Sequence, residues 1–322
     1  MKSLQKGILF SIAIVCCIIS LQSCKTDKKQ TQKDTIPTEE KVKKENVITI
    51  ITENMEFQMP DTIPSGWNTF QYFNKSPQTH FFLVDKYPEG KNSEDAKKFV
   101  APVFDKAMLL INEGKAKKGF AEFANLPEWF SKVVFLGGSG LISSEKTGET
   151  TLYLKPGNYI LECYVKMSNG VFHSSMGMVK DVVVSNKSSE NTEPKDDVDV
   201  NVTISSTDGI VFKDSVFAGR RTFSIYFKDQ VVYETFVGHD INLVKLQNKT
   251  DLKNLENWMN WADPKGLIEP APSDVIFLGG VNDMPKGSTG YFTAILEKGI
   301  YGLISEVPNP SDKKLFKTFQ VY

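Results

Sequence analysis

The sequence predicts an all-β fold made of two similar domains in tandem, and two observations lead to this prediction. Short apolar runs rich in aromatic and β-branched residues are separated by Gly, Pro, Asn and Asp, which is the pattern of strands and turns. The chain also repeats itself: Val133-Val-Phe-Leu-Gly-Gly138 matches Val275-Ile-Phe-Leu-Gly-Gly280, and Gly157-Asn-Tyr159 falls on Gly299-Ile-Tyr301 at the same spacing. Because such a repeat usually marks a duplicated unit, we expect two copies of one β-rich domain.

The first domain is expected over residues 47–185 and the second over 198–322, with a polar linker over 186–197. A chain of 322 residues is long enough for each domain to bury its own core. We expect strands over residues 47–51, 57–59, 68–73, 81–85, 133–136, 150–154, 158–164, 178–184 and 198–204.

Each domain is also expected to carry a helical insertion. Apolar residues recur at helical spacing over 99–111 and again over 252–262. In the first insertion, Ser93 is the expected N-cap, Gly114 the expected stop, and Pro102 a break or kink. The apolar stripe of this helix predicts core packing.

Residues 1–23 are predicted to be a lipoprotein signal peptide. Lys2 and Lys6 precede an apolar run over 8–21, which has the charged start of a secretory signal and is short for a membrane span. The alternative is an ordinary signal peptide followed by a chance cysteine.

The apolar run ends in Leu21-Gln-Ser-Cys24, which resembles the lipobox of bacterial lipoproteins. The resemblance implies cleavage before Cys24 and lipidation of that cysteine, so the partner of this end of the chain would be a membrane. Lys25 follows the cysteine, which by the same analogy favours the outer membrane of a bacterial cell envelope. Residues 24–46 are rich in Lys, Thr, Gln and Glu and are expected to be a disordered tether.

Cysteine usage then isolates one thiol. Cys16 and Cys17 leave with the signal peptide and Cys24 carries lipid, so Cys163 is the free thiol of the mature chain. Outside the cytoplasm a lone thiol is unusual, because cysteines there usually form disulfides. Such a thiol is either buried and inert, or reactive, or bound to a metal.

The residues near Cys163 favour the metal. His173 and Met178 follow within sixteen residues, and a second imidazole, His80, lies upstream. Thiolate, imidazole and thioether are the ligands that redox-active copper prefers, while zinc at one cysteine and two histidines is a lesser possibility.

These residues match a family pattern. Gly157-x-Tyr159-x-x-x-Cys163, then His173-x-x-x-Gly177-Met178, resembles the copper loop of plastocyanin-like cupredoxins. Phe73-Asn74 followed by Pro77-Gln-Thr-His80 is similar to the cupredoxin segment that carries the first histidine. The resemblance implies Greek-key β-sandwiches and one copper ion in the first domain, with His80, Cys163 and His173 as equatorial ligands and Met178 as the weak axial ligand.

The sequence departs from this pattern in one loop. Nine residues, 164–172, separate Cys163 from His173, where familiar cupredoxins have a shorter loop. A longer loop can close, since closure entropy grows slowly with length, or it can misplace His173 and open the site to solvent. Met176 is the alternative axial ligand, although the Gly-Met pattern favours Met178.

The second domain lacks this ligand set. Ser305 falls on the position of Cys163 and Leu315 on that of Met178, while His239 aligns only loosely with His80. We therefore expect the second domain to be a degenerate copy with a structural or interaction role.

The favoured function is one-electron transfer by an envelope lipoprotein, with an unknown redox partner. The alternatives are a copper-binding or delivery protein with a copper-exchange partner, and a copper-free interaction module. No general base, nucleophile pair or second copper cluster is visible, so an enzyme is not expected. The net charge of −1 does not suggest a nucleic-acid partner.

Overall fold

The computed structural model describes residues 46–213, 215–233 and 236–322. The predicted signal peptide, the predicted lipidation site Cys24 and the predicted tether up to residue 45 lie outside the described residues. In the part of the chain that is described, no helix is long and apolar enough to cross a bilayer.

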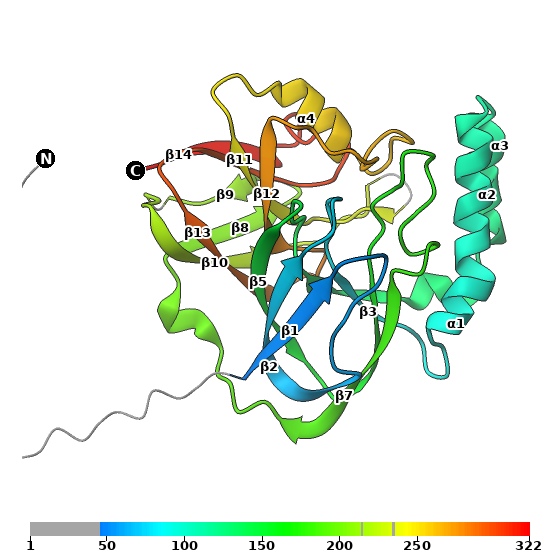
Figure 1. Cartoon of the computed structure of the whole chain (residues 1–322), viewed down its shortest axis with the longest axis horizontal. Helices are drawn as coiled ribbons and strands as arrows, with labels where there is room; N and C mark the ends of the chain where they lie inside the picture. The colour runs from blue at the N-terminus through cyan, green and yellow to red at the C-terminus, as the bar shows by residue number, and fades with distance from the viewer. Residues whose placement is uncertain (1–45, 214, 234–235) are drawn as a thin grey trace, which may run out of the picture. The chain divides into compact units, whose positions relative to one another are not determined.

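The first half of the fold contains two groups of paired strands (Figure 1). One group has the order β4-β3-β6-β7, and in the other β2 pairs with both β1 and β5. The strands are β1 (Val47–Thr52), β2 (Thr62–Asn74), β3 (Leu83–Lys86), β4 (Val134–Gly138), β5 (Lys146–Leu154), β6 (Gly157–Glu162) and β7 (Val179–Ser188).

The second half repeats this arrangement. Its groups have the orders β12-β11-β14-β15 and β9-β8-β10-β13, and the parallel pair β8·β10 corresponds to the parallel pair β1·β2. The prediction of an all-β fold with two similar halves in tandem is therefore confirmed, whereas the exact domain boundaries stay predictions. The strands are β8 (Val200–Ser205), β9 (Gly209–Val211), β10 (Gly219–Phe227), β11 (Ile241–Leu246), β12 (Val275–Val281), β13 (Thr289–Leu296), β14 (Gly299–Ile304) and β15 (Phe316–Val321).

The two halves share a sheet. Strand β5 pairs antiparallel with β13, its counterpart in the second half, with Phe292 opposite Thr150. Strand β2 belongs to both groups of the first half, because residues 62–65 pair with β7 and residues 66–74 with β5. One continuous hydrophobic core contains buried residues of both halves.

Each half carries its helices at the same place in the strand order, as predicted. In the first half they lie between β3 and β4, and in the second between β11 and β12. They are α1 (Ser93–Asp95), the π-helix η1 (Ala96–Val100), α2 (Ala101–Asn112), α3 (Ala116–Glu122), the 3₁₀ helices η2 (Phe123–Asn125) and η3 (Glu128–Lys132), and α4 (Leu252–Met259).

The local helix predictions differ in their outcome. The N-cap of α1 is Asn92, not Ser93, because the Asn92 side chain accepts hydrogen bonds from the N–H groups of Glu94 and Asp95. Pro102 lies in the first turn of α2, directly after the π-helix η1, so the regular α-helical pattern is interrupted where the break or kink was predicted. Gly114 follows the end of α2 with a φ of 79°, as a stop requires.

The strand predictions also need correction at their ends. The strand expected over 57–59 is a single pairing of Gln58 with Ile51. The strand expected over 158–164 ends at Glu162, so Cys163 comes directly after β6. The predicted linker is partly regular, because β7 runs to Ser188 and residues 194–197 form the 3₁₀ helix η4 (Pro194–Asp197).

The repeated Gly-Gly motif has a steric reason. A Cβ on Gly138 would lie 1.9 Å from the carbonyl oxygen of Phe82, and one on Gly280 would lie 1.9 Å from that of Ile241. Only glycine allows such an approach of two backbones. The same contact therefore fixes β4 against β3 and β12 against β11 in the two halves.

Candidate metal site

Four predicted ligands come from three separate segments of the first half. His80 lies in the loop before β3, Cys163 directly follows β6, and His173 and Met178 lie in the loop between β6 and β7. All four side chains are completely buried.

The structure brings three donor atoms of this set together. The Sγ of Cys163 lies 3.8 Å from Nδ1 of His80 and 3.7 Å from Nδ1 of His173, and the two Nδ1 atoms are 3.1 Å apart. Across the described ranges, these three residues are the only group of three His, Cys, Asp or Glu side chains whose donor atoms lie close enough to hold one metal ion.

The spacing fits one metal ion. An ion with bonds of ~2.0 Å to nitrogen and ~2.3 Å to sulfur separates its ligand atoms by about 3.3–3.8 Å at tetrahedral or trigonal angles. The donor set also fits copper, because two imidazoles, a thiolate and a thioether are the ligands of electron-transfer copper sites.

Burial controls the protonation of these groups. It lowers the pKa of His80 to about 3, with the neighbouring His173 as a further cause, and it lowers the pKa of His173 to about 4. Both imidazoles are therefore neutral at pH 7 and keep a lone pair for a metal. Burial also raises the pKa of the Cys163 thiol to about 12, so the thiol gives up its proton only when a cation replaces it.

A hydrogen bond to Ser76, a residue that the sequence pattern does not single out, orients His80. The Nε2 atom of His80 lies 2.9 Å from Oγ of Ser76, and such a bond leaves Nδ1 free to face Cys163. Ser76 lies four residues before His80, between Asn74 and Pro77. The backbone of His80 exchanges two hydrogen bonds with Ile142, of 3.1 and 2.7 Å. The first ligand is thus held by backbone and side chain together.

The nine-residue loop does not displace His173, because most of the loop folds on itself. The N–H of Met167 donates to the carbonyl of Val171, and the N–H of His173 donates to the carbonyl of Val165, each at 2.8 Å. The extra residues form a small hairpin whose two ends meet beside Cys163. The hairpin is anchored to the second half, where the N–H of Lys166 donates to the carbonyl of Leu267 at 2.8 Å.

The two candidate axial methionines differ in burial. The Met178 side chain is fully buried, whereas that of Met176 is 53% exposed. The backbone also ties Met178 to the site, since its carbonyl accepts from the N–H of Cys163 at 3.2 Å and its N–H donates to the carbonyl of His173 at 2.9 Å.

Strand pairing aligns the two halves residue by residue. In the first half Leu83 pairs with Glu162, and in the second Asn242 pairs with Ile304, which places His239 at the position of His80 and Ser305 at that of Cys163. The loop bonds extend this alignment, since Ser305 N–H donates to the Leu315 carbonyl and Leu315 N–H to the Pro310 carbonyl. The aligned pairs are His80 with His239, Cys163 with Ser305, His173 with Pro310, and Met178 with Leu315.

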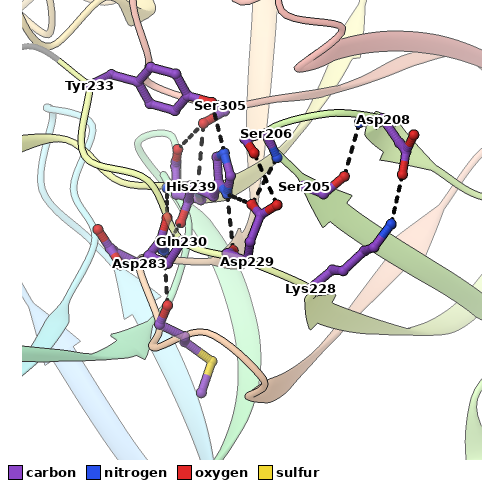
Figure 2. A network of polar contacts seen from close by, with 12 residues as sticks. Ser205, Ser206, Asp208, Lys228, Asp229, Gln230, Tyr233, His239, Asp283 and Ser305 are labelled. Atoms are coloured by element: carbon purple, nitrogen blue, oxygen red, sulfur yellow. Dashed lines mark hydrogen bonds and ion pairs between the residues drawn. The ribbon is translucent and has the colours of Figure 1, made fainter.

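The second half uses these positions for hydrogen bonds (Figure 2). The ring of His239 lies between the carbonyl oxygen of Asp229, 3.2 Å from Nδ1, and the hydroxyl of Tyr233, 3.0 Å from Nε2. The hydroxyl of Ser305 donates to the carboxylate of Asp240. Both ring nitrogens and the hydroxyl are satisfied within the chain, so this position has no donor set for a metal.

Comparisons with known proteins place copper proteins among the solved structures that are similar. Auracyanin A, a "blue" copper protein from Chloroflexus aurantiacus, is 20% identical, with a TM-score of 0.26, and the match covers 44% of this chain and 98% of that one. A copper nitrite reductase from Nitrosomonas europaea is 10% identical, with a TM-score of 0.22, and the match covers 85% of this chain and 93% of that one.

A multicopper oxidase is 11% identical with a TM-score of 0.20, and the match covers 85% of this chain and 87% of that one. These structures include enzymes as well as a blue copper protein. No family model and no curated protein matches the chain. At these identities and TM-scores, the similarities carry no argument about activity, and the argument for a metal depends on the cluster of His80, Cys163 and His173.

Proposed function

We propose that this protein is an envelope lipoprotein that binds one copper ion in a type 1-like site and transfers single electrons. The observation that carries the proposal is the convergence of three buried donor atoms, from His80, Cys163 and His173, within 3.1–3.8 Å of one another. Copper would supply the one-electron redox change when bound, and the buried Met178 would be a further ligand.

The role of the chain is to hold the ligands in place and to exclude water. The three donors already face one another, and the bonds to Ser76, Ile142 and Val165 keep them there. A site held in this way changes little in geometry when the charge of the ion changes, which favours fast electron transfer.

The lipid anchor at Cys24 and a location at the outer membrane complete the proposal. The tether would let the folded part reach a redox partner. The contact with that partner would be small, because transient electron-transfer complexes bury little surface. Copper delivery is the weaker alternative, because rapid exchange requires an accessible site and all four ligand side chains are completely buried.

The test is a visible spectrum of the protein begun after Cys24, with Cu(II) added, recorded beside Cys163→Ser. We expect an intense blue or green thiolate-to-copper band that the variant lacks. Ser305→Ala is the matched control, because it removes the side-chain oxygen at the equivalent position of the second half and should leave the band unchanged. A colourless wild-type protein without tight copper would contradict the proposal.

A second measurement separates electron transfer from delivery. The loaded protein is cycled between reduction and oxidation in the presence of a Cu(I) chelator. We expect the coloured form to return in full over repeated cycles, because a buried site retains Cu(I). Loss of copper to the chelator in the first cycle would favour delivery.

A further inference from the structure

A cavity of about 90 Å³ lies between the helices of the first half and the segment 236–240 of the second. It is distinct from the metal site, since none of the four predicted ligands lines it. By comparison, a site for one water molecule needs only about 10–15 Å³ by the same kind of measure, so this cavity has room for a larger guest.

Aromatic rings form one wall of the cavity. Phe104 of α2 and Phe236 of the second half pack against each other with ring centroids 5.4 Å apart and ring planes tilted by 47°. Phe172 and Trp261 extend the wall, at 5.7 Å from Phe104 and 5.8 Å from Phe236. Ring faces carry negative partial charge, so such a wall attracts a cation that lacks a tight water shell.

Carboxyl groups form the other wall. Glu162, Asp240, Asp283 and Glu306 all line the cavity. Among the described residues, none of these four groups forms an ion pair with Lys, Arg or His. The buried Lys166 acts on Glu306 through its charge, but its amine donates to the carbonyls of Asp263 and Pro264 at 3.2 and 3.4 Å.

Two polar atoms of the residues that line this cavity lack a partner. Glu306 is 1% exposed, and its Oε2 accepts from the hydroxyl of Tyr164 at 3.0 Å, but its Oε1 has no hydrogen-bond partner. The Nδ2 of Asn282, which also lines the cavity, has none either. An unpaired buried carboxylate oxygen costs free energy that a bound cation would recover.

A single metal ion does not suit this cavity. The acidic groups are too dispersed to act together, because the group of His80, Cys163 and His173 is the only cluster of three possible ligands in the part of the chain that the structure describes. An organic cation suits it better, because the charge can lie near one carboxylate while alkyl groups contact the aromatic rings.

We propose that this cavity binds a small organic cation of the alkylammonium class. The cationic nitrogen would lie near the free oxygen of Glu306, with its alkyl groups against Phe104, Phe236 and Trp261. Burial, with the neighbouring Asp240 as a further cause, raises the pKa of Glu306 well above its usual range, so the carboxyl group holds a proton in the empty cavity and the bound cation would displace it. This inference does not depend on copper, because the cavity and the metal ligands are separate.

The test is calorimetric titration of the soluble chain begun after Cys24, with choline as the probe. The neutral isostere 3,3-dimethylbutan-1-ol has the same shape without the charge. We expect saturable 1:1 binding of choline, at least about tenfold tighter than binding of the alcohol, a gap of about 1.4 kcal/mol. Equal binding of both would overturn the proposal, since the cavity would then be merely apolar, and so would no binding of either.

Two variants locate the binding. Glu306→Gln keeps an acceptor for Tyr164 and removes the charge, so choline should bind at least about tenfold more weakly. Its matched control is Glu193→Gln, because Glu193 also accepts from a tyrosine hydroxyl, that of Tyr291 at 2.6 Å, but does not line the cavity. Phe236→Leu keeps an apolar side chain without the ring, so it should weaken the binding of choline more than the binding of the alcohol. Choline binding unchanged in both cavity variants would overturn the proposal.

Discussion

The two halves of this chain place the same backbone around different chemistry. The order of strands, the position of the helices and the close Gly-Gly contact are repeated. At the aligned positions, however, the first half brings together the donors of Cys163 and two histidines, whereas the second pairs Ser305 with Asp240 and His239 with Asp229 and Tyr233. The comparison teaches that the same fold can gather three possible metal ligands in one half and a set of internal hydrogen bonds at the same place in the other.

The most severe test of this comparison removes a ligand. His173→Gly should weaken copper binding by more than about a hundredfold, because even the loss of a supporting group beyond the ligands typically costs 10–100-fold. Pro310→Gly changes the aligned residue of the second half and should leave copper affinity unchanged. Titration with Cu(II) against a competing chelator measures both. Equal losses in the two variants would mean that the effect is one of folding.

The converse test grafts ligands onto the second half. We expect Ser305→Cys with Pro310→His to create no second copper site, because both ring nitrogens of His239 are already hydrogen-bonded and Asp240 lies beside position 305. The copper-to-protein ratio, measured by elemental analysis, should stay at one. A ratio of two would show that ligand identity alone separates the halves.

A smaller effect is expected from the group that orients His80. Ser76→Ala removes the partner of its Nε2 and should weaken copper binding by about 10–100-fold while leaving the coloured band in place. Ser65→Ala, in β2 at an exposed side-chain contact, is the control and should change nothing. Unchanged copper affinity in Ser76→Ala would show that backbone bonds alone hold His80.

A pH-dependent effect is expected at the tyrosine–glutamate pair that joins the halves. Burial raises the pKa of Glu306, so the folded state binds a proton that the unfolded state releases, and this contribution to stability is lost as the pH rises above the unfolded value. Glu306→Gln should therefore stabilise the protein by at least about 1 kcal/mol more at about pH 8 than at about pH 5. Chemical unfolding at the two pH values measures this, and a larger gain at the lower pH would contradict it.

The smallest expected effect distinguishes the proposed roles of the two methionines, Met178 and Met176. Met178→Leu conserves volume, so it should cost less than about 1.5 kcal/mol of stability, yet it should shift the copper band and the redox potential. Met176 is largely exposed, and Met176→Leu should change neither. A spectrum that responds to Met176→Leu and not to Met178→Leu would exchange their proposed roles.

Local sequence determined the class of fold and the chemistry that is available. Short apolar runs between turn residues indicated the strands, because β-branched and aromatic side chains favour strands while Gly, Pro, Asn and Asp favour the turns between them. The repeat of residues 133–138 in 275–280 revealed the duplication, and the residue types at positions 163, 173 and 178 indicated soft-metal ligands. These signals can be read in short stretches of chain, so no distant contact is needed to see them.

Only the tertiary structure decided what these residues do together. The long loop keeps His173 in place because it folds into a hairpin anchored on Leu267, a contact between residues about a hundred positions apart. The loose alignment of His239 with His80 became definite only through strand pairing, and the acids around Glu306 meet only because the two halves pack together. Such contacts depend on how distant strands pair, and a pattern of neighbouring residues carries no record of that pairing.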